Sequence, residues 1–557
     1  MSLVTAKEIS KILKIHSLGY FGIFIGWLVL LISRISELNK VYTQHKSKMG
    51  LSFLNSILNA FEIQYDIPEE DLKRIPKTGA FITISNHPLG GIDGVLLMKL
   101  GIAQRENYKI LGNFFLHRIA PLQPHVFPVN PFENHKNVRS SVSGIKNAMT
   151  HLKAGFPLGV FPAGEVSTKK EGSIYVDKNW DLSAIKLIKN ANVPVIPIYF
   201  HAKNSKLFYV ISKFNSLFRT AKLPSELLTQ KYRFIKIRIG NPISIKDQNE
   251  YDNLSQYSAF LRKKTYILAN SFQKKPLILS SQNLKIPVKA KQIADKKNTI
   301  SLIKEVSALR ESGGRLLESK NYEVFFSKPK AIPNLLHEIG RLREITFRAV
   351  GEGTNKSIDL DKYDHYYSHL MLWDRTENIL VGAYRMGFGK QIMKRFGIKG
   401  FYIHTLFRID PDLYPMMENT IEMGRAFIVK DYQKKPMPLF LLWKGIINIT
   451  LRYPDHKYLM GGVSISNRFS DFSKSLMIEF MKSHYYDPYV AQYIRPKKEF
   501  KVKLKDGDKD FVFDATKSDM RKFDKIIDEI EPGALRIPVL IKKYVKQNAR
   551  LVAFNVD

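Results

Sequence analysis

Apolar and polar positions in the first half of the chain alternate between the spacing of strands and that of helices. Residues 80–84 form a short apolar run that predicts a buried strand, and the apolar run Val95-Leu96-Leu97, just past a glycine-rich turn, predicts a helix. Residues 234–240 alternate as a half-buried strand does, and residues 251–272 have helical spacing. This order predicts an α/β domain over residues 61–275.

The longest apolar run lies near the N-terminus, over residues 18–32. It is shorter than the roughly 20 residues that a spanning helix needs, and no small-residue cleavage site follows it. We therefore expect an uncleaved anchor or a helix lying in the membrane interface, with a helix buried in the protein as the alternative. A second amphipathic stretch, residues 51–61, presents an apolar face to lipid or to the domain. Together these features predict a membrane-associating helical segment over residues 1–60.

The pattern changes in the second half. Residues 276–297 are polar, basic and poor in aromatic side chains, which is typical of a linker. Helical spacing over residues 332–350 is followed by short strands and a helix near residues 439–449, which predicts a second mixed α/β domain over residues 298–500. Residues 501–557 are predicted to form a C-terminal extension that packs on this second domain. The expected fold class is α/β, with two mixed α/β domains behind the N-terminal helical segment.

Composition narrows the classes of partner. The 557 residues carry a formal charge of +36, which favours anionic lipid or an acidic carrier protein. Nucleic acid is not expected, because the lysines are spread along the chain and no zinc finger, RNA-recognition signature or basic arm is present. The absence of cysteine excludes disulfides, a cysteine acyl-enzyme and a thiolate metal site, and we expect neither a metal nor a cofactor.

The stretch SNHPLGGIDG, residues 85–94, holds the clearest candidate chemistry. It places His87 and Asp93 a short glycine-rich turn apart, behind the predicted strand and at the start of the predicted helix. A neutral imidazole oriented by a carboxylate is a general base that removes the proton of an attacking hydroxyl. We therefore expect His87 to be the base and Asp93 to orient it in acyl transfer to an alcohol.

Four segments in order resemble the motifs of the glycerolipid acyltransferases related to lysophosphatidic acid acyltransferase. They are residues 85–94, residues 112–118, the run Phe161-Pro162-Ala163-Gly164-Glu165-Val166-Ser167, and residues 193–197. The first departs from the family spacing, because five residues rather than four separate His87 from Asp93. The resemblance implies that the first domain has the family fold, that Arg118 binds the acceptor, and that the other substrate-binding residues are Asn86, Gly91, Pro162, Gly164, Glu165 and Pro197.

The third segment departs from the phospholipid-making members in an informative way. They have a glutamate before the glycine and an arginine two residues after it, whereas this chain has Ala163 and Val166. Apolar side chains cannot form the bidentate clamp that a phosphate favours. The expected acceptor is therefore free of phosphate, and Glu165 offers a carboxylate for an ammonium group.

The second domain resembles the GNAT-like N-acyltransferases that use acyl carrier protein to make lyso-ornithine or lyso-glycine lipids. The resemblance covers roughly residues 300 to 500, and it implies that an acidic cluster and three arginines bind the substrate or the carrier's phosphate. These residues are Arg343, Asp361, Asp364, Arg385, Glu422 and Arg425. The basic loop over residues 430–438 lacks the glycine-rich form expected for coenzyme A, which favours acyl carrier protein as the donor here.

Two domains in this order imply a bifunctional acyltransferase of phosphate-free aminolipid synthesis on the cytoplasmic face of the inner membrane. The second domain would N-acylate an amino acid, with ornithine preferred to glycine, using a 3-hydroxyacyl group. The first domain would O-acylate the 3-hydroxyl of the resulting lyso-lipid from acyl-ACP or acyl-CoA. Two alternatives stay open: a lysophosphatidate acyltransferase with a non-catalytic C-terminal domain, and a membrane scaffold that binds carrier protein or lipid.

Overall fold

The chain divides into two compact units. The computed structural model describes residues 5–7, 10, 15–32, 35–117, 119–129, 139–171, 174–212, 223, 225–228, 234–272, 290–504, 512, 519–531 and 535–557. Unit 1 comprises Met1–Lys274 with Arg521–Arg536, and unit 2 comprises Lys275–Met520 with Ile537–Asp557. The break at Lys274 lies beside the expected domain end at residue 275. Most of the expected linker lies outside the described residues, and residues 290–297 form neither helix nor strand.

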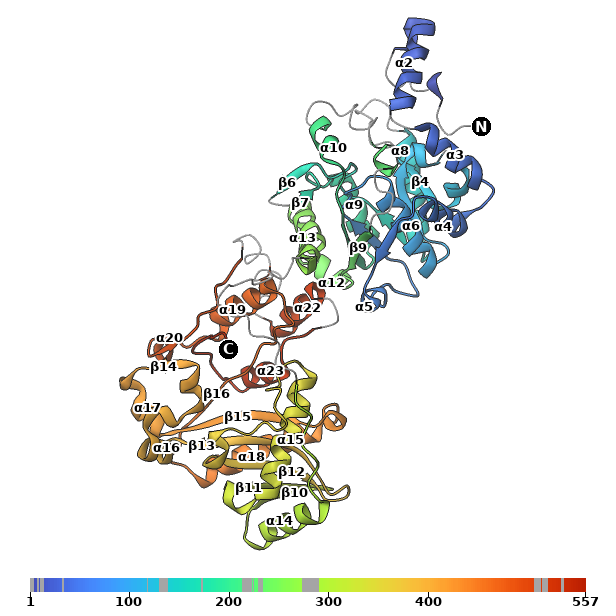
Figure 1. Ribbon diagram of the computed structural model, residues 1–557. Coiled ribbons are helices and arrows are strands. Elements are labelled where there is room, and N and C mark those ends of the chain that lie inside the picture. The colour runs from blue at the N-terminus through green and yellow to red at the C-terminus, as the bar shows by residue number, and fades with distance from the viewer. Residues whose placement is uncertain are drawn as a thin grey trace. The chain divides into compact units, whose positions relative to one another are not determined.

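Unit 1 is built on a seven-stranded sheet in the order β1-β9-β8-β2-β5-β3-β4 (Figure 1). All neighbours are parallel except β8 and β9, which are antiparallel. The strands are β1 (Gln64–Asp66), β2 (Ile82–Ser85), β3 (Lys109–Asn113), β4 (Val126–Val129), β5 (Leu158–Val160), β8 (Val195–His201) and β9 (Phe234–Ile239), with a separate hairpin of β6 (Lys169–Glu171) and β7 (Ile174–Val176). The strand predicted before the glycine-rich turn is therefore β2, at the centre of the sheet.

Helices pack on both faces of this sheet. Ile196, Ile198 and Phe200 of β8 join the core under α4 and α6, whereas the intervening Tyr199 meets Tyr266 of α13 with ring centroids 5.7 Å apart. The described helices of Met1–Lys274 are α2 (Gly19–Ile32), α3 (Ile35–His45), α4 (Gly50–Ala60), α5 (Glu69–Leu72), α6 (Ile92–Gln104), α7 (Phe114–His117), α8 (Arg139–Lys153), α9 (Leu182–Ala191), α10 (Lys206–Ile211), α12 (Ile245–Gln248) and α13 (Leu254–Tyr266). The predicted helix over residues 251–272 is α13 followed by a 3₁₀ turn, Ile267–Phe272.

The N-terminal segment is divided between two environments. In α4, Phe53, Leu54 and Leu58 are buried in the core of unit 1, so of the two partners expected for residues 51–61, lipid or the domain, these side chains contact the domain. The apolar face of α4 packs against the core of unit 1. By contrast, α2 extends away from the sheet of unit 1 (Figure 1). Among the described residues no helix has the length and apolar character required to span a membrane.

Unit 2 is built on a six-stranded sheet in the order β10-β11-β12-β13-β15-β16. Its neighbours are antiparallel except β15 and β16, which are parallel. The strands are β10 (Arg315–Ser319), β11 (Tyr322–Ser327), β12 (Ser368–Asp374), β13 (Ile379–Phe388), β15 (Thr420–Ile428) and β16 (Tyr458–Gly461), with a separate pair of β14 (Phe407–Ile409) and β17 (Ile494–Pro496).

Alternate residues of β12 face two different cores. Leu370 and Leu372 pack with α18, and Met371 and Trp373 pack with α14 and α15 on the opposite face. The described helices of unit 2 are α14 (Thr299–Glu311), α15 (Pro333–Ala349), α16 (Gly389–Phe396), α17 (Tyr414–Glu418), α18 (Met437–Arg452), α19 (Asp471–Tyr485), α20 (Pro488–Ala491) and α23 (Val539–Lys546). Helices α15 and α18 correspond to those predicted over residues 332–350 and 439–449. The mixed α/β, two-domain part of the expected fold class is thus confirmed.

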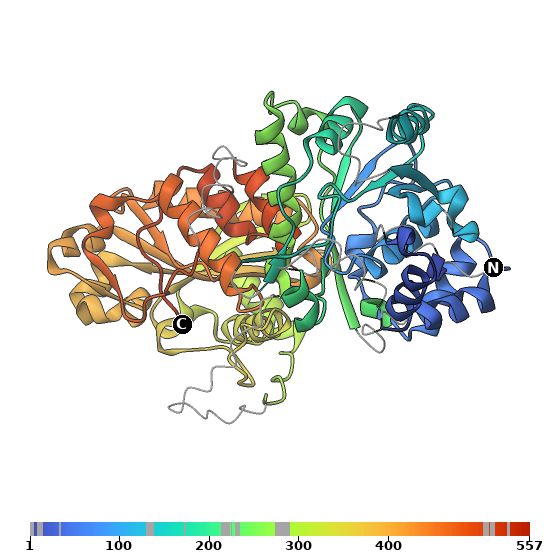
Figure 2. The same cartoon turned by 90° about the horizontal axis from the view of Figure 1, so that it is seen from above.

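One helix from the C-terminal region belongs to the other unit. Helix α22 (Met520–Ile530) packs in unit 1 beside α13 (Figure 1, Figure 2). Glu529 of α22 forms an ion pair with Lys264 of α13. The prediction that residues 501–557 pack entirely on the second domain is therefore wrong for Arg521–Arg536. The physical reason is the buried Arg238 of β9, whose guanidinium donates to the carbonyls of Glu529 and Ile530 at 2.8 and 3.0 Å.

Candidate active sites

The turn between β2 and α6 brings His87 back towards Asp93. Gly90 lies in the left-handed region at φ +84, which favours glycine, and a Cβ there would come within 2.8 Å of Val166 Cγ2. The helix starts at Ile92, so Asp93 is in its first turn and close to its free backbone amides. The sequence thus folds locally so that a carboxylate is fixed opposite the imidazole.

The Asp93 carboxylate is fully buried and held on both oxygens. Oδ2 lies 3.1 Å from His87 Nδ1 and accepts the backbone N–H groups of Leu89 and Gly90 at 2.9 and 3.2 Å, while Oδ1 accepts that of Gly94 at 2.9 Å. Burial alone would raise the pKa of Asp93, but the charge of His87 and these hydrogen bonds hold it below its usual value. An ionised Asp93 orients the imidazole and leaves Nε2 as the nitrogen that acts on a substrate.

His87 sits at the edge of the protein interior, with 16% of its side chain exposed. The ring of Phe161, from the third sequence segment, lies over it with centroids 4.1 Å apart. Burial alone would lower the pKa of His87, yet the charge and hydrogen bond of Asp93 and the charge of Asp177 raise it above the usual value. The imidazole is therefore a stronger base than a free histidine, and deprotonating a hydroxyl is chemistry suited to it.

Three of the residues predicted to bind substrate in unit 1 make packing or hydrogen-bond contacts within the domain. The Asn86 amide accepts the N–H of Phe200 and donates to its carbonyl, at 2.8 and 3.0 Å, linking β2 to β8. The absent side chain of Gly91 makes room for Leu227, and Pro197 is buried in β8 against Gly240. Each of these three residues therefore has a contact within the domain that involves no ligand.

The third segment lies next to His87, as the predicted site requires. Gly164 turns the chain at φ +65, and the carbonyl of Pro162 accepts the N–H of Asp181 at 2.9 Å. Glu165 forms an ion pair with Lys178, at 2.8 Å. Its carboxylate thus already faces a cation of this chain. Arg118, predicted to bind the acceptor, lies outside the described residues.

In unit 2 the six predicted residues lie in one polar cluster. At its interior, Asp364 accepts from Arg343 at 2.7 Å and lies 3.2 Å from Arg385, and all three side chains are at most 2% exposed. The two guanidinium groups hold the pKa of Asp364 well below its usual range against the effect of burial. His369 Nε2 lies 3.2 Å from the Asp364 carbonyl, and burial lowers the pKa of this histidine to about 4. This interior part is a closed ion-pair network.

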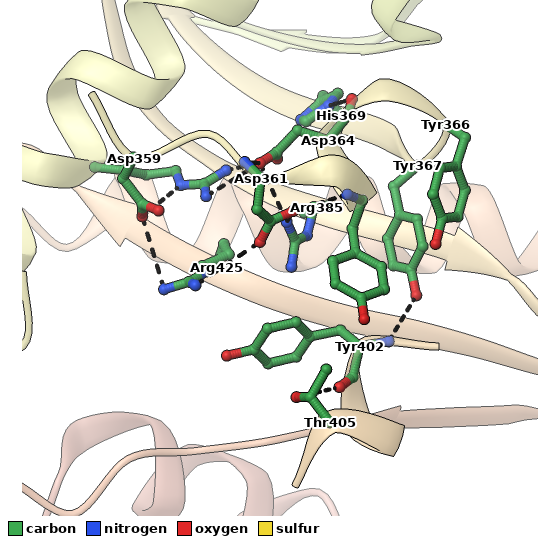
Figure 3. Close-up of polar contacts among 12 residues, drawn as sticks. Asp359, Asp361, Asp364, Tyr366, Tyr367, His369, Arg385, Tyr402, Thr405 and Arg425 are labelled. Atoms are coloured by element: carbon green, nitrogen blue, oxygen red, sulfur yellow. Dashed lines mark hydrogen bonds and ion pairs between the residues drawn. The ribbon is translucent and has the colours of Figure 1, made fainter. Parts of the chain in front are cut away.

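The cluster is partly exposed at Asp361 and Arg425, whose side chains are 24% and 23% exposed. Figure 3 shows these two side chains facing each other. Arg425 lies in a bulge of β15 at φ +51, which turns its guanidinium towards Asp361 and Asp359, at 3.8 and 3.7 Å. Among the described residues, Asp361 Oδ2 and Arg425 Nε have no hydrogen-bond partner. Both atoms are buried, and Asp361 Oδ2 faces Arg425 Nη2 at 3.8 Å, so the two side chains form a partly exposed ion pair with unused hydrogen-bonding capacity.

Aromatic rings connect this edge to Glu422. The Arg385 guanidinium lies over the rings of Tyr367 and Tyr402, at 5.4 and 5.2 Å (Figure 3). Tyr367 donates its hydroxyl to the Glu422 carboxylate. Glu422 also accepts the backbone N–H groups of Tyr402 and Ile403 at 2.9 and 2.7 Å. Burial raises the pKa of Glu422 in spite of these donors. The residue supports the loop of Tyr402 rather than facing solvent.

Sequence reasoning missed several residues of both sites. Asp359 and Tyr402 belong to the second cluster, and Asp177 contacts His87. Within the described residues no group of three or more carboxylates and histidines is arranged to hold a metal ion. A signal for Asp359 existed, since it stands two residues before Asp361, but nothing in the sequence pairs Asp177 with residue 87.

Comparisons with known proteins agree with this division. Residues 14–275 match the acyltransferase family, and residues 342–443 match the acetyltransferase (GNAT) domain family. A glycine N(alpha)-acyltransferase of Bacteroides thetaiotaomicron is 29% identical over 254 residues, which are 43% of this chain and 74% of that protein. A lyso-glycine lipid O-acyltransferase of Phocaeicola vulgatus is 27% identical over 277 residues, 47% of this chain and 94% of that protein.

Among solved structures, the 1-acyl-sn-glycerophosphate (LPA) acyltransferase of Thermotoga maritima aligns with 43% of this chain and 86% of its own. The sequence identity is 16% and the TM-score is 0.25. The two resemblances seen in the sequence are confirmed by the family matches and by the two kinds of relative.

Proposed function

The chain carries an acyltransferase domain followed by a GNAT domain, and on that basis we propose that it makes a phosphate-free aminolipid in two steps. The GNAT domain joins a 3-hydroxyacyl group to the amine of an amino acid, and the first domain esterifies the 3-hydroxyl. The observation that carries this proposal is that relatives with these two consecutive activities each match a part of one chain. Their names favour glycine over ornithine as the amino acid, which reverses the order expected from sequence.

The ester-forming step uses His87 as its base. Nε2 takes the proton of the 3-hydroxyl while its oxygen attacks the thioester carbonyl of the acyl donor. The C–O bond forms, the C–S bond breaks, and the proton passes from His87 to the departing thiolate. Asp93 acts by holding Nδ1 at 3.1 Å. Ala163 and Val166, which supply no charge for a phosphate, fit an acceptor that has none.

The amide-forming step belongs to the solvent-exposed edge of the second cluster. The partly exposed carboxylate of Asp361 binds the ammonium group of glycine, and the partly exposed guanidinium of Arg425 binds its carboxylate. The ammonium group first loses a proton to solvent. The amine nitrogen then attacks the thioester carbonyl, the C–N bond forms as the C–S bond breaks, and the second proton lost from nitrogen passes to the departing thiolate. Asp364 and Arg343 then act by fixing Arg385 and Asp361 in place.

The donor and the setting are also part of the proposal. Acyl carrier protein is the donor for the GNAT domain, and neither step needs a cofactor or a metal. The protein works on the cytoplasmic face of the inner membrane, with α2 lying in the lipid interface. Tyr20, Phe21, Phe24 and Trp27 of this helix are 51–92% exposed, and such aromatic side chains favour the interface.

Purified full-length chain tests the proposal directly. It is given 3-hydroxyacyl-ACP with glycine or ornithine, and separately an acyl donor with N-(3-hydroxyacyl)glycine or lysophosphatidate. We expect an amide with glycine and an ester with the N-acyl acceptor. Acylation of lysophosphatidate alone would establish the rival phospholipid function. The scaffold alternative predicts no product and no difference between wild type and His87→Ala.

A further inference from the structure

Asp177 is a buried acid that the proposed chemistry does not use. It follows β7 and is fully buried, and its carboxylate accepts three hydrogen bonds. The donors are the backbone N–H of His87 at 3.2 Å, the hydroxyl of Ser167, and the indole N–H of Trp180 at 3.0 Å. Burial raises the pKa of Asp177 above its usual value, against the lowering effect of these donors. All three groups nevertheless direct a hydrogen at the carboxylate, an arrangement that suits its ionised form.

Ser167 completes a second connection to the same residue. Its backbone N–H donates to the carbonyl of His87 at 2.9 Å, while its hydroxyl donates to Asp177. Both main-chain polar groups of His87 are therefore held by the Ser167–Asp177 pair. Asp93 holds the side chain of His87 from the start of α6, so that main chain and side chain are fixed by two different segments.

Asp177 is itself fixed by α13. Its backbone N–H donates to the hydroxyl of Tyr266 at 2.7 Å, and its carbonyl accepts from Arg262 at 2.9 Å. A carboxylate held in this way transmits the position of α13 and of the third sequence segment to the base. Since the general base must lie within hydrogen-bond reach of the hydroxyl that it deprotonates, a small shift of its main chain reduces the rate strongly.

We propose that Asp177 is a positioning residue for acyl transfer, which together with Ser167 fixes the main chain of His87. The inference rests on the proposed role of His87 as the base. Asp177 touches neither acceptor nor donor, and it acts only through His87.

The charge of Asp177 affects the pH dependence of the reaction, which a purely structural residue would leave unchanged. The charged groups that act on His87 are Asp93, from α6, and Asp177, from the segment after β7, and both favour the protonated imidazole. Loss of the Asp177 charge lowers the pKa of His87, so that the base becomes deprotonated at lower pH. The rising limb of the pH profile of kcat/KM must then move towards lower pH.

Asp177→Asn in the full chain tests the inference, with N-(3-hydroxyacyl)glycine and acyl-ACP as substrates. We expect kcat for ester formation to fall by about 10–100-fold, KM for the acceptor to change less than about twofold, and the rising limb to shift to lower pH. N-acylation of glycine by the same preparation is the control and should not change. A wild-type kcat and pH profile would overturn the inference.

Two further variants keep the test decisive. If Asp177→Asn does not fold, Ser167→Ala removes only the hydroxyl donor, and a kcat unchanged from wild type would overturn the inference. His87→Ala separates this inference from the proposed function. If His87→Ala abolishes ester formation while Asp177→Asn behaves as wild type, only the positioning role fails; if His87→Ala is fully active, the proposed function fails as well.

Discussion

Glu529 accepts the backbone N–H of Asn241 at 2.9 Å across a sequence separation of 288 residues. The same carboxylate forms an ion pair with Lys264, and the carbonyl of Glu529 accepts from Arg238. Unit 1 is therefore completed by a helix that is synthesised after the whole sheet of unit 2. The two proposed activities share one chain. The first domain includes a helix, α22, that follows the second domain in the sequence.

Residues 1–272 alone should be less stable than the same residues in the full chain. Without α22, Lys264 loses its partner and Arg238 loses two carbonyl acceptors. We expect the free energy of unfolding to fall by about 3–5 kcal/mol, which corresponds to a fall in melting temperature of about 10 °C. Thermal unfolding of residues 1–272 with and without a peptide of residues 519–536 measures this, and equal midpoints would contradict it.

Asp71→Ala should destabilise unit 1 strongly. Asp71 is 2% exposed and accepts from Arg238 Nε at 2.7 Å, so its loss leaves a buried guanidinium without its carboxylate. The expected cost is about 3–5 kcal/mol in the free energy of unfolding. The neighbouring Glu70→Ala is the matched control, because Glu70 is 50% exposed and pairs with the exposed Lys73. Glu70→Ala should change the free energy of unfolding by no more than about 0.5 kcal/mol. Urea unfolding of both variants measures the two changes, and equal losses of stability would contradict the prediction.

Substitution of Asp364 should mainly reduce stability, whereas substitution of Asp361 should mainly reduce N-acylation activity. Asp364→Ala leaves Arg343 and Arg385 buried with fewer acceptors, and we expect about 3–5 kcal/mol of lost stability. Asp361 is 24% exposed, so Asp361→Asn should cost less than about 1 kcal/mol. It should nevertheless lower N-acylation of glycine at least about tenfold. Unfolding and activity measured on the same samples test this, and an active Asp361→Asn would exclude Asp361 from the site.

Ester formation should increase with pH through the raised pKa of His87. The base must be unprotonated, and the charge of Asp93 keeps its proton bound to a pH above the ordinary value of 6.5 for histidine. The same shift favours the folded state at low pH, and that contribution is lost as pH rises through the folded-state pKa. A pH profile of kcat/KM for the acceptor measures the midpoint, and a midpoint below 6.5 would be inconsistent with this environment.

The sequence predicted those parts of the sites in which the contacting residues are close together in the chain. The strand, glycine turn and helix start around His87 could be read directly, because a six-residue separation leaves few ways to bring Asp93 opposite the imidazole. Asp177 could not be predicted, since it reaches His87 across 90 residues and looks like any polar residue after a short strand. The sequence of residues 501–557 likewise did not indicate that α22 covers the first domain.

The most direct test of the two-step account is the lipid content of a host that expresses the full chain or His87→Ala. Mass spectrometry of lipid extracts should find a diacylated, phosphate-free glycine lipid with the wild type. With His87→Ala it should find the mono-acylated N-acyl glycine accumulating in its place. An increase in phosphatidate without any amino-acid lipid, or a diacylated product from His87→Ala, would contradict the account.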